Sequence, residues 1–299
     1  MIAQYVADGV VSGALVGLGA IGLTLTYAVL GFANFAQGEF LTWGAYFALA
    51  LLSGTGLGHA AALPPFAFGW PLLLVLPAAV ALTGGLAVAL DHVLFRPLRR
   101  RAGPMGLVIA SFGASLALAN LVVLLFGPKP RYFSRAIAFA MPVAPGVRLT
   151  ADRMLVVALA LLAMAALHLL LTRSRLGLAM RASAENPALA AVYGVDAEGV
   201  RRASWWIGGG MSALAGVLLG QTEQIQPLMG ADMLLSLFAA AILGGIGSAG
   251  GAFAGGLIVG LAEALSVPLL GAAYRPAAAF LVLFAVLMLR PTGLFGERP

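Results

Sequence analysis

"ILGGIGSAGGAFAGGLIVGLAEAL", residues 242–265, is a nearly unbroken apolar run that carries glycines at four-residue spacing. Residues four apart lie on one face of a helix, and small residues on such a face let two helix backbones approach closely. This stretch therefore predicts tightly packed helices. The spacing appears here and in two other segments: Gly247, Gly251 and Gly255 with Gly256 and Gly260 beside them, Ser212, Gly216 and Gly220, and Gly13 and Gly17.

The composition extends this prediction to the whole chain. Of its 299 residues, 62% are hydrophobic and only 9% are charged, whereas soluble domains carry about 25% charged residues. A membrane-spanning helix needs about 20 mostly apolar residues, and no period-two pattern typical of strands accompanies these runs. We expect an all-α, polytopic transmembrane bundle with about eight or nine spans. The apolar segments are 8–30, 40–53, 71–95, 104–126, 153–171, 203–222, 234–248, 251–270 and 274–290.

Two of these segments, 40–53 and 234–248, are short for a full crossing and contain or adjoin glycines. Short, interrupted segments predict broken or re-entrant helices, which must line a protein-buried or water-filled space. The sequences of residues 30–40 and 243–253 align without gaps and share five residues, Leu, Gly, Ala, Gly and Phe. If this faint repeat is structural, two breaks occupy related positions around one pathway.

Motifs for enzymatic chemistry are missing from the sequence. Lys129 is the single lysine, so no phosphate-binding loop of the Walker type is possible. The three histidines lack metal-ligand spacing, there is no cysteine, and no nucleophile elbow occurs. We therefore expect no catalytic residue, no metal site and no cofactor, and any energy from ATP must come from another chain.

Polar side chains within apolar segments are the candidates for a transport pathway. Asn34, Gln37, Glu39 and Thr42 cluster between the first two apolar segments, and Glu263 lies within a later one. A carboxylate in lipid is costly, so such groups face a cavity, a partner or the bundle interior. The alternative is structural, with Asn34 or Gln37 satisfying backbone groups freed at a helix break.

Arginine placement predicts the orientation. Residues 96–101 contain four arginines and residues 173–202 contain five, against a basic loop at 127–153. The excess places 173–202 in the cytoplasm, and with nine spans the N-terminus lies outside.

The cytoplasmic loop 173–202 is long for a helix connection. Ser183 or Asn186 can cap a short helix at about 186–194, Pro187 suits its first turn, and Gly194 can end it. Its apolar face suits docking into a groove of another protein, or else the membrane surface.

Several motifs resemble permeases of branched-chain amino acid importers of the ATP-binding cassette class. In "TRSRLGLAMRASAENPALAAVYGVDAEGVR", residues 172–201, the family's coupling-loop pattern R-x-G-x-x-x-R-A-x-x-x-(N/D) is met. "GFANFAQGEFLTWGAY" at 31–46 resembles its N-terminal motif, and residues 225–265 are the strongest match. The chain resembles LivH-type subunits more than the longer LivM-type.

The resemblance implies one permease domain over 1–299 in a bacterial inner membrane. It implies a second, LivM-type permease subunit, two cytoplasmic ATP-binding subunits and a periplasmic or lipid-anchored substrate-binding protein. The coupling residues it implies are Arg175, Arg181, Glu185, Asn186 and Gly194.

Other functions stay open at this point. The same permease type serves urea and short amides, and Glu39 with Glu263 could form the ionisable pair of an ion-coupled secondary transporter. The sequence shows no concentrated set of charges for both ends of a zwitterionic amino acid. We therefore expect weak binding by the permease, with affinity residing in the binding protein.

Overall fold

The computed structural model describes residues 2–56, 65–99, 101–134, 139–290 and 292–295. Its long helices are α1 (Ile2–Leu30), α2 (Gln37–Gly54), α3 (Pro71–Leu90), α5 (Pro104–Phe126), α6 (Ala151–Arg173), α9 (Ala197–Thr222), α10 (Met229–Gly244), α11 (Ala249–Leu270) and α12 (Arg275–Leu289). Shorter elements are the π-helix Asp91–Phe95 that continues α3 into α4 (Arg96–Arg99), α7 (Arg175–Glu185), α8 (Pro187–Val192) and the 3₁₀ turn Ala272–Tyr274.

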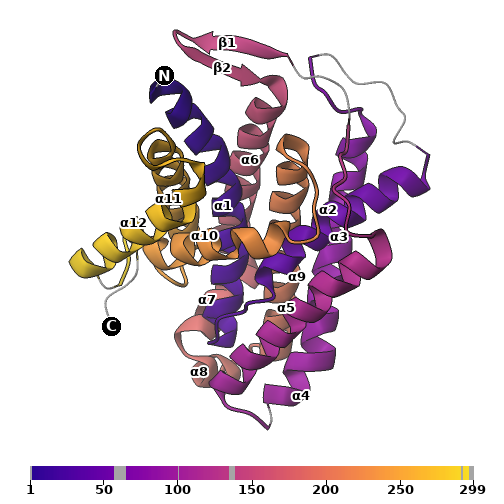
Figure 1. The fold of residues 1–299 in the computed structure, drawn as a ribbon. Helices are drawn as coiled ribbons and strands as arrows, with labels where there is room; N and C mark the ends of the chain where they lie inside the picture. The colour runs from indigo at the N-terminus through magenta and orange to yellow at the C-terminus, as the bar shows by residue number, and fades with distance from the viewer. Residues whose placement is uncertain (1, 57–64, 100, 135–138, 291, 296–299) are drawn as a thin grey trace.

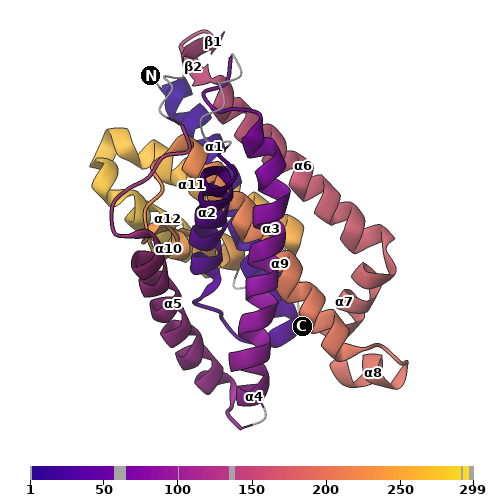
Figure 2. The ribbon, with the colours of Figure 1, turned by 90° about the vertical axis from the view of Figure 1, so that its right-hand side faces the viewer.

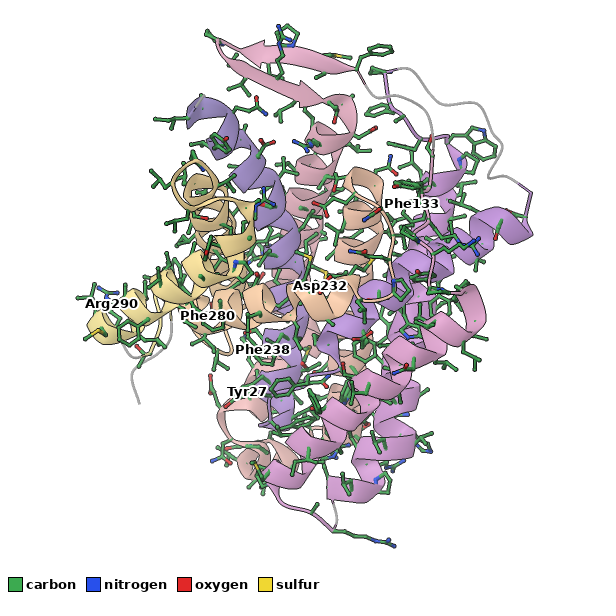
Figure 3. The ribbon with its side chains drawn as sticks, viewed as in Figure 1. Tyr27, Phe133, Asp232, Phe238, Phe280 and Arg290 are labelled. Atoms are coloured by element: carbon green, nitrogen blue, oxygen red, sulfur yellow. The ribbon has the colours of Figure 1, made fainter. Side chains whose placement is uncertain are left out.

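The molecule has two distinct ends (Figure 1). The N-terminus of α1 and a small β-hairpin lie at one end, and α4, α7 and α8 lie at the other. Figure 2 shows α6 running along the side of the bundle to α7 and α8, which project from its far end as an arm. The outer face of the bundle carries apolar side chains, including the half-exposed Phe280 of α12 (Figure 3).

Glycines join α1 to α11 along an antiparallel seam. A Cβ atom on Gly13 would lie 2.8 Å from the Cα of Leu257, and one on Gly17 would lie 2.9 Å from the ring of Phe253. From the other side, a Cβ atom on Gly256 or Gly260 would collide with α1 backbone. The expected tight packing of these two glycine rows is therefore confirmed.

Glycines also allow close packing of α9 against α1 and α2. A side chain on Gly216 would collide with the carbonyl of Leu41 in α2, and one on Gly44 with the backbone of Ala213 in α9. A Cβ atom on Gly22 of α1 would meet the carbonyl of Gly208. The central helices α1, α2, α9 and α11 thus pack at backbone contact rather than through large side chains.

Two breaks interrupt the bundle at the places that the sequence indicates. Residues 31–36 separate α1 from α2, and residues 245–248 separate α10 from α11. Gly31, Gly245 and Gly247 have φ angles of 72°, 95° and 97°, a region that residues with a Cβ rarely adopt. The apolar segment predicted at 234–248 corresponds to α10, which begins earlier, at Met229. It ends at Gly244, just before the glycines with positive φ angles.

The all-α prediction misses one element. Strands β1 (Ala140–Ala144) and β2 (Val147–Thr150) form an antiparallel hairpin in the segment before α6, with Ala140 opposite Thr150. The chain reverses at Pro145 and Gly146, and Gly146 has φ 78°. This hairpin is short and exposed, so it carries no apolar alternation that a sequence pattern could reveal.

Within the described residues, seven helical segments are long and apolar enough to cross a membrane: α1, α3 through α4, α5, α6, α9, α11 and the segment Ala272–Leu289. Helix α10 is a further, shorter apolar helix. These segments agree with a polytopic helical bundle, and their number roughly fits the eight or nine spans predicted.

Enlarging the α1–α11 seam should destabilise the protein. In Gly260→Leu the new side chain must displace the backbone of Gly13, and overpacking of this kind costs about 1–3 kcal/mol. We expect a lower melting temperature and less monodisperse protein in detergent. Gly250→Ala is the control in the same helix, because its Cβ would lie 3.7 Å from Met164. Equal melting temperatures for the two variants would show that the seam does not limit stability.

Candidate functional site

The first break is held by amide side chains. The Asn34 side-chain oxygen accepts from the backbone N–H of Ala36 (3.1 Å), which satisfies a donor left free in the break just before α2 begins. Its amide nitrogen donates to Gln37 (3.4 Å). Gln37 in turn donates across the bundle to the carbonyl of Gly208 (3.1 Å) and to Ser212 (2.7 Å) on α9. Both amides are fully buried, so the structural role predicted as the alternative is present.

Thr42 joins the two broken helices. Its hydroxyl accepts from the backbone N–H of Gly230 in the first turn of α10 (3.0 Å). A side chain on Gly38 or Gly230 would collide with the other residue's backbone. The start of α2 and the start of α10 therefore meet in the middle of the bundle.

Glu39 is buried, as expected, and it faces α5. One carboxylate oxygen accepts from the Ser115 hydroxyl (3.1 Å), while the other has no hydrogen-bond partner among the described residues. Trp43, one turn further along α2, donates its indole N–H to the carbonyl of Leu118 on α5 (3.3 Å). Glu39 and Trp43 therefore face α5, whereas Gln37 and Thr42 face α9 and α10.

Glu263 lies elsewhere, on the wall of a cavity of 510 Å³ near the end of the molecule that carries the N-terminus. Its carboxylate accepts from the Ser236 hydroxyl on α10 (2.6 Å). The structure therefore does not bring Glu263 together with the four polar residues near the first break, and none of those four lines this cavity.

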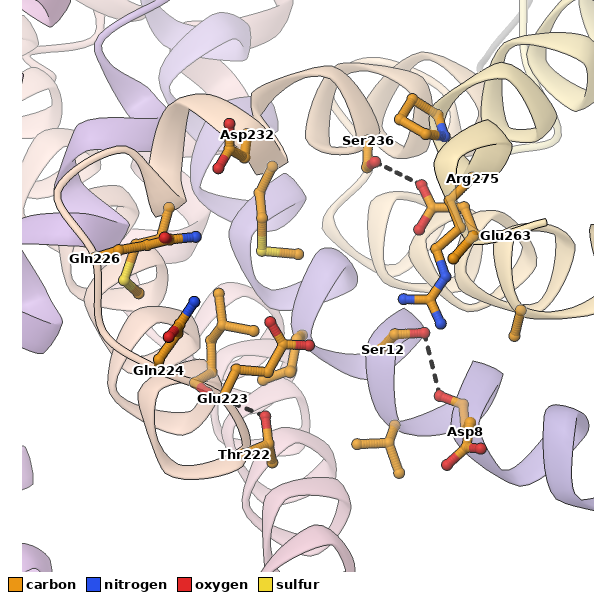
Figure 4. A pocket seen from close by; sticks show the side chains of 18 of the residues that line it. Asp8, Ser12, Thr222, Glu223, Gln224, Gln226, Asp232, Ser236, Glu263 and Arg275 are labelled. Atoms are coloured by element: carbon orange, nitrogen blue, oxygen red, sulfur yellow. Dashed lines mark hydrogen bonds between the residues drawn. The ribbon is translucent and has the colours of Figure 1, made fainter. Parts of the chain in front are cut away.

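The cavity corrects the expectation that charges are scattered. Four carboxylates, of Asp8, Glu223, Asp232 and Glu263, and two guanidinium groups, of Arg153 and Arg275, surround it (Figure 4). They come from α1, α6, α10, α11, α12 and the turn after α9. This cluster is not evident from the sequence, because each charged residue lies in a different helix or turn. The six side chains come together only when those segments pack against one another.

At the opposite end, α6 and α7 meet at a fixed angle. Ser174 caps α7 by accepting from the backbone N–H of Gly177 (2.9 Å), and its hydroxyl donates to the carbonyl of Leu170 (2.6 Å). A side chain on Gly177 would collide with the carbonyl of Leu171. The guanidinium of Arg181 donates to that same carbonyl, where it complements the negative end of α6. In the R-x-G-x-x-x-R spacing, the glycine and the second arginine are therefore the residues that contact the end of α6.

The next helix, α8, has defined caps at both ends. Asn186, not Ser183, is the N-cap: its side chain accepts from the backbone N–H of Leu189 (3.0 Å), whereas Ser183 is buried within α7. Gly194, with φ 81°, closes the C-terminus, where the Val195 N–H donates to the Ala190 carbonyl (3.0 Å). The predicted short helix therefore exists, over Pro187–Val192.

The outer face of α8 is apolar and uncovered. Val192 and Tyr193 are 81% and 80% exposed, and Leu189 is also exposed, while Ala190 packs inward. Arg175 and Glu185 are exposed on α7, and neither makes a side-chain hydrogen bond or ion pair with another described residue. The contacts of Ser174 and Arg181 fix α7 relative to α6, and α8 follows α7. The exposed apolar face of α8 is therefore suited to contact with another protein.

Comparisons with known proteins identify the family of this chain. Residues 5–290 match the family model of the branched-chain amino acid transport system / permease component. The chain is 34% identical to the high-affinity branched-chain amino acid transport system permease protein BraD of Pseudomonas aeruginosa, over 98% of this chain and 95% of BraD. It is 33% identical to the permease protein LivH of Escherichia coli K12, with the same coverage.

An archaeal relative is similar over a slightly shorter region. The probable branched-chain amino acid transport permease protein LivH of Methanocaldococcus jannaschii is 31% identical over 93% of this chain and 87% of its own length. No solved structure matches the chain. The match over residues 5–290 and the 33–34% identity over nearly the whole chain show that this chain belongs to the permease component family of branched-chain amino acid transport systems.

Proposed function

We propose that this chain is the membrane-spanning permease subunit of an ATP-binding cassette importer for branched-chain amino acids. The observation that carries the proposal is the uncovered apolar face of α8 at the end of the α6–α7 joint. Because the sequence has no phosphate-binding loop, energy must reach the bundle through a surface contact. The family and its relatives support the substrate class.

The assembly that follows has four kinds of subunit. Residues 1–299 form one permease domain in a bacterial inner membrane, with the segment 173–202 in the cytoplasm. A LivM-type permease pairs with it, and one of the two cytoplasmic ATP-binding subunits contacts α8. A substrate-binding protein delivers the amino acid outside. The separation of the cavity and α8 to opposite ends of the molecule supports this orientation.

The polar residues divide into two roles in this proposal. Glu263 borders the outward-facing part of the pathway, because it lies on the cavity wall. Asn34, Gln37, Glu39 and Thr42 fix the broken helix that borders the pathway deeper in the bundle, because their bonds join α2 to α5, α9 and α10. Arg175, Arg181, Glu185, Asn186 and Gly194 shape and display the arm.

Uptake by the reconstituted importer tests this function. Proteoliposomes containing this chain, its LivM-type partner and the ATP-binding subunits should accumulate labelled leucine only with ATP inside and loaded binding protein outside. An ATP-binding subunit with its Walker lysine replaced is the control and should abolish accumulation. Uptake driven by a proton or sodium gradient without ATP would instead identify a secondary transporter, and uptake of urea alone would reassign the substrate.

Changing Arg181 should uncouple the ATP-binding subunits. In Arg181→Glu the solvent-exposed hydrogen bond to the Leu171 carbonyl is replaced by repulsion at the negative end of α6. We expect lower ATP-dependent uptake and weaker copurification of the ATP-binding subunits, with the melting temperature of the bundle retained. Arg181→Lys keeps a cationic donor and should restore much of the activity. Normal uptake by Arg181→Glu would contradict the assignment of the arm.

The Glu39 carboxylate should matter for its hydrogen bond and not for its charge. Glu39→Gln keeps an acceptor for Ser115 and should leave assembly and uptake close to the parent protein. Glu39→Leu removes the link between α2 and α5, which is worth about 1 kcal/mol in a membrane, and should lower both. Ser115→Ala should reproduce the stability loss of Glu39→Leu, as measured by melting in detergent. A fully active Leu variant would show that the polar group is dispensable.

A further inference from the structure

The cavity near the N-terminal end has two facing walls (Figure 4). Glu263 and Arg275 lie on one wall, supplied by α11 and the start of α12. Glu223 and Asp232 lie on the other, supplied by the turn after α9 and by α10. Apolar side chains complete the lining between them: Val11, Leu15, Leu219, Met229 and Met233.

Only part of the charge around the cavity is neutralised within the protein. Arg153 forms an ion pair with Asp8, and one oxygen of Glu263 accepts from Ser236. Arg275 makes no hydrogen bond or ion pair with another described residue, although it is close enough to Glu263 to interact electrostatically. One anionic and one cationic group thus stand near each other on the same wall without pairing.

We propose that this cavity is an acceptor site for a zwitterionic α-amino acid with an apolar side chain. The Arg275 guanidinium receives the α-carboxylate, for which its fork of donors is suited. The free oxygen of Glu263 receives the ammonium, and Asp232 and Glu223 add negative potential from the facing wall. The Met and Leu side chains take the substrate's apolar side chain.

This inference rests on the proposed function and identifies where the released substrate first binds. Because the charged groups lie in an open cavity, solvent screens them and the site is weak. A weak site suits a conduit that must pass its substrate on, and it agrees with high affinity residing in the binding protein.

Protection of an introduced thiol tests the site, since the chain has no cysteine. Ser12 lines the cavity, so Ser12→Cys is the probe, in the complete membrane complex without binding protein. Labelling of this chain by an impermeant methanethiosulfonate is followed by mass spectrometry. Leucine at a concentration that fills two thirds of the sites should slow labelling about threefold. Leucinamide lacks the carboxylate and 4-methyl-2-oxopentanoate lacks the ammonium, so neither should protect at that concentration.

Variants separate this site from general effects. Arg275→Gln and Glu263→Gln, each combined with Ser12→Cys, should remove protection by leucine, and Glu263→Gln keeps an acceptor for Ser236. Arg290→Gln, at the other end of α12, is the matched control and should leave protection intact. Ser53→Cys, exposed at the end of α2, should be labelled at the same rate with and without leucine.

The outcomes distinguish this inference from the proposed function. ATP-dependent leucine uptake by the same complex, with no protection by leucine or with protection that survives Arg275→Gln, would overturn the acceptor site and leave the permease function standing. Equal protection by the two analogues would also overturn it. Absence of uptake of every branched-chain amino acid would instead overturn the proposed function.

Discussion

The close approach of α1 and α11 is the contact on which the other contacts depend. Lipid gives apolar helices no hydrophobic reason to associate, so dispersion at short range and backbone proximity must hold them together. Gly13 and Gly17 on one helix and Gly256 and Gly260 on the other leave no Cβ between the two backbones. With these helices fixed, α9 and α10 pack against them through further glycines.

Breaking a helix inside a membrane frees backbone groups that no water can satisfy. Within the first break, the Asn34 side chain accepts a hydrogen bond from the backbone N–H of Ala36. Gln37 donates to a carbonyl of α9, and Thr42 accepts from a backbone N–H of α10. In the second break Ser248 caps α11 by accepting from the Gly251 N–H (3.0 Å). The buried polar residues therefore make the irregular backbone possible, and that backbone brings α2 and α10 together.

Helix α6 contacts both the cavity and the arm formed by α7 and α8. Arg153, in the first turn of α6, lines the cavity, and the carbonyl of Leu171, in its last turn, accepts from Arg181 of α7. A helix of this length spans about 35 Å and moves nearly as a rigid body. A displacement of α8 by a bound partner would therefore reach the cavity wall through α6. In the proposed importer, α6 would thereby link the closure of the cytoplasmic ATP-binding subunits to the release of substrate from the cavity.

The membrane class, the positions of the long helices and both breaks could be predicted from the amino-acid sequence, because apolar run length and glycine spacing are local properties. The short capped helix after α7 could be predicted as well, since Asn186, Pro187 and Gly194 act on their neighbours in the chain. The hairpin before α6 has no such local pattern. The folded structure was needed to show that Gln37 bonds to α9, that Glu39 faces α5, and that charged side chains from six segments surround one cavity. Those outcomes depend on which helix faces pack together, and that packing is set by contacts between residues far apart in sequence.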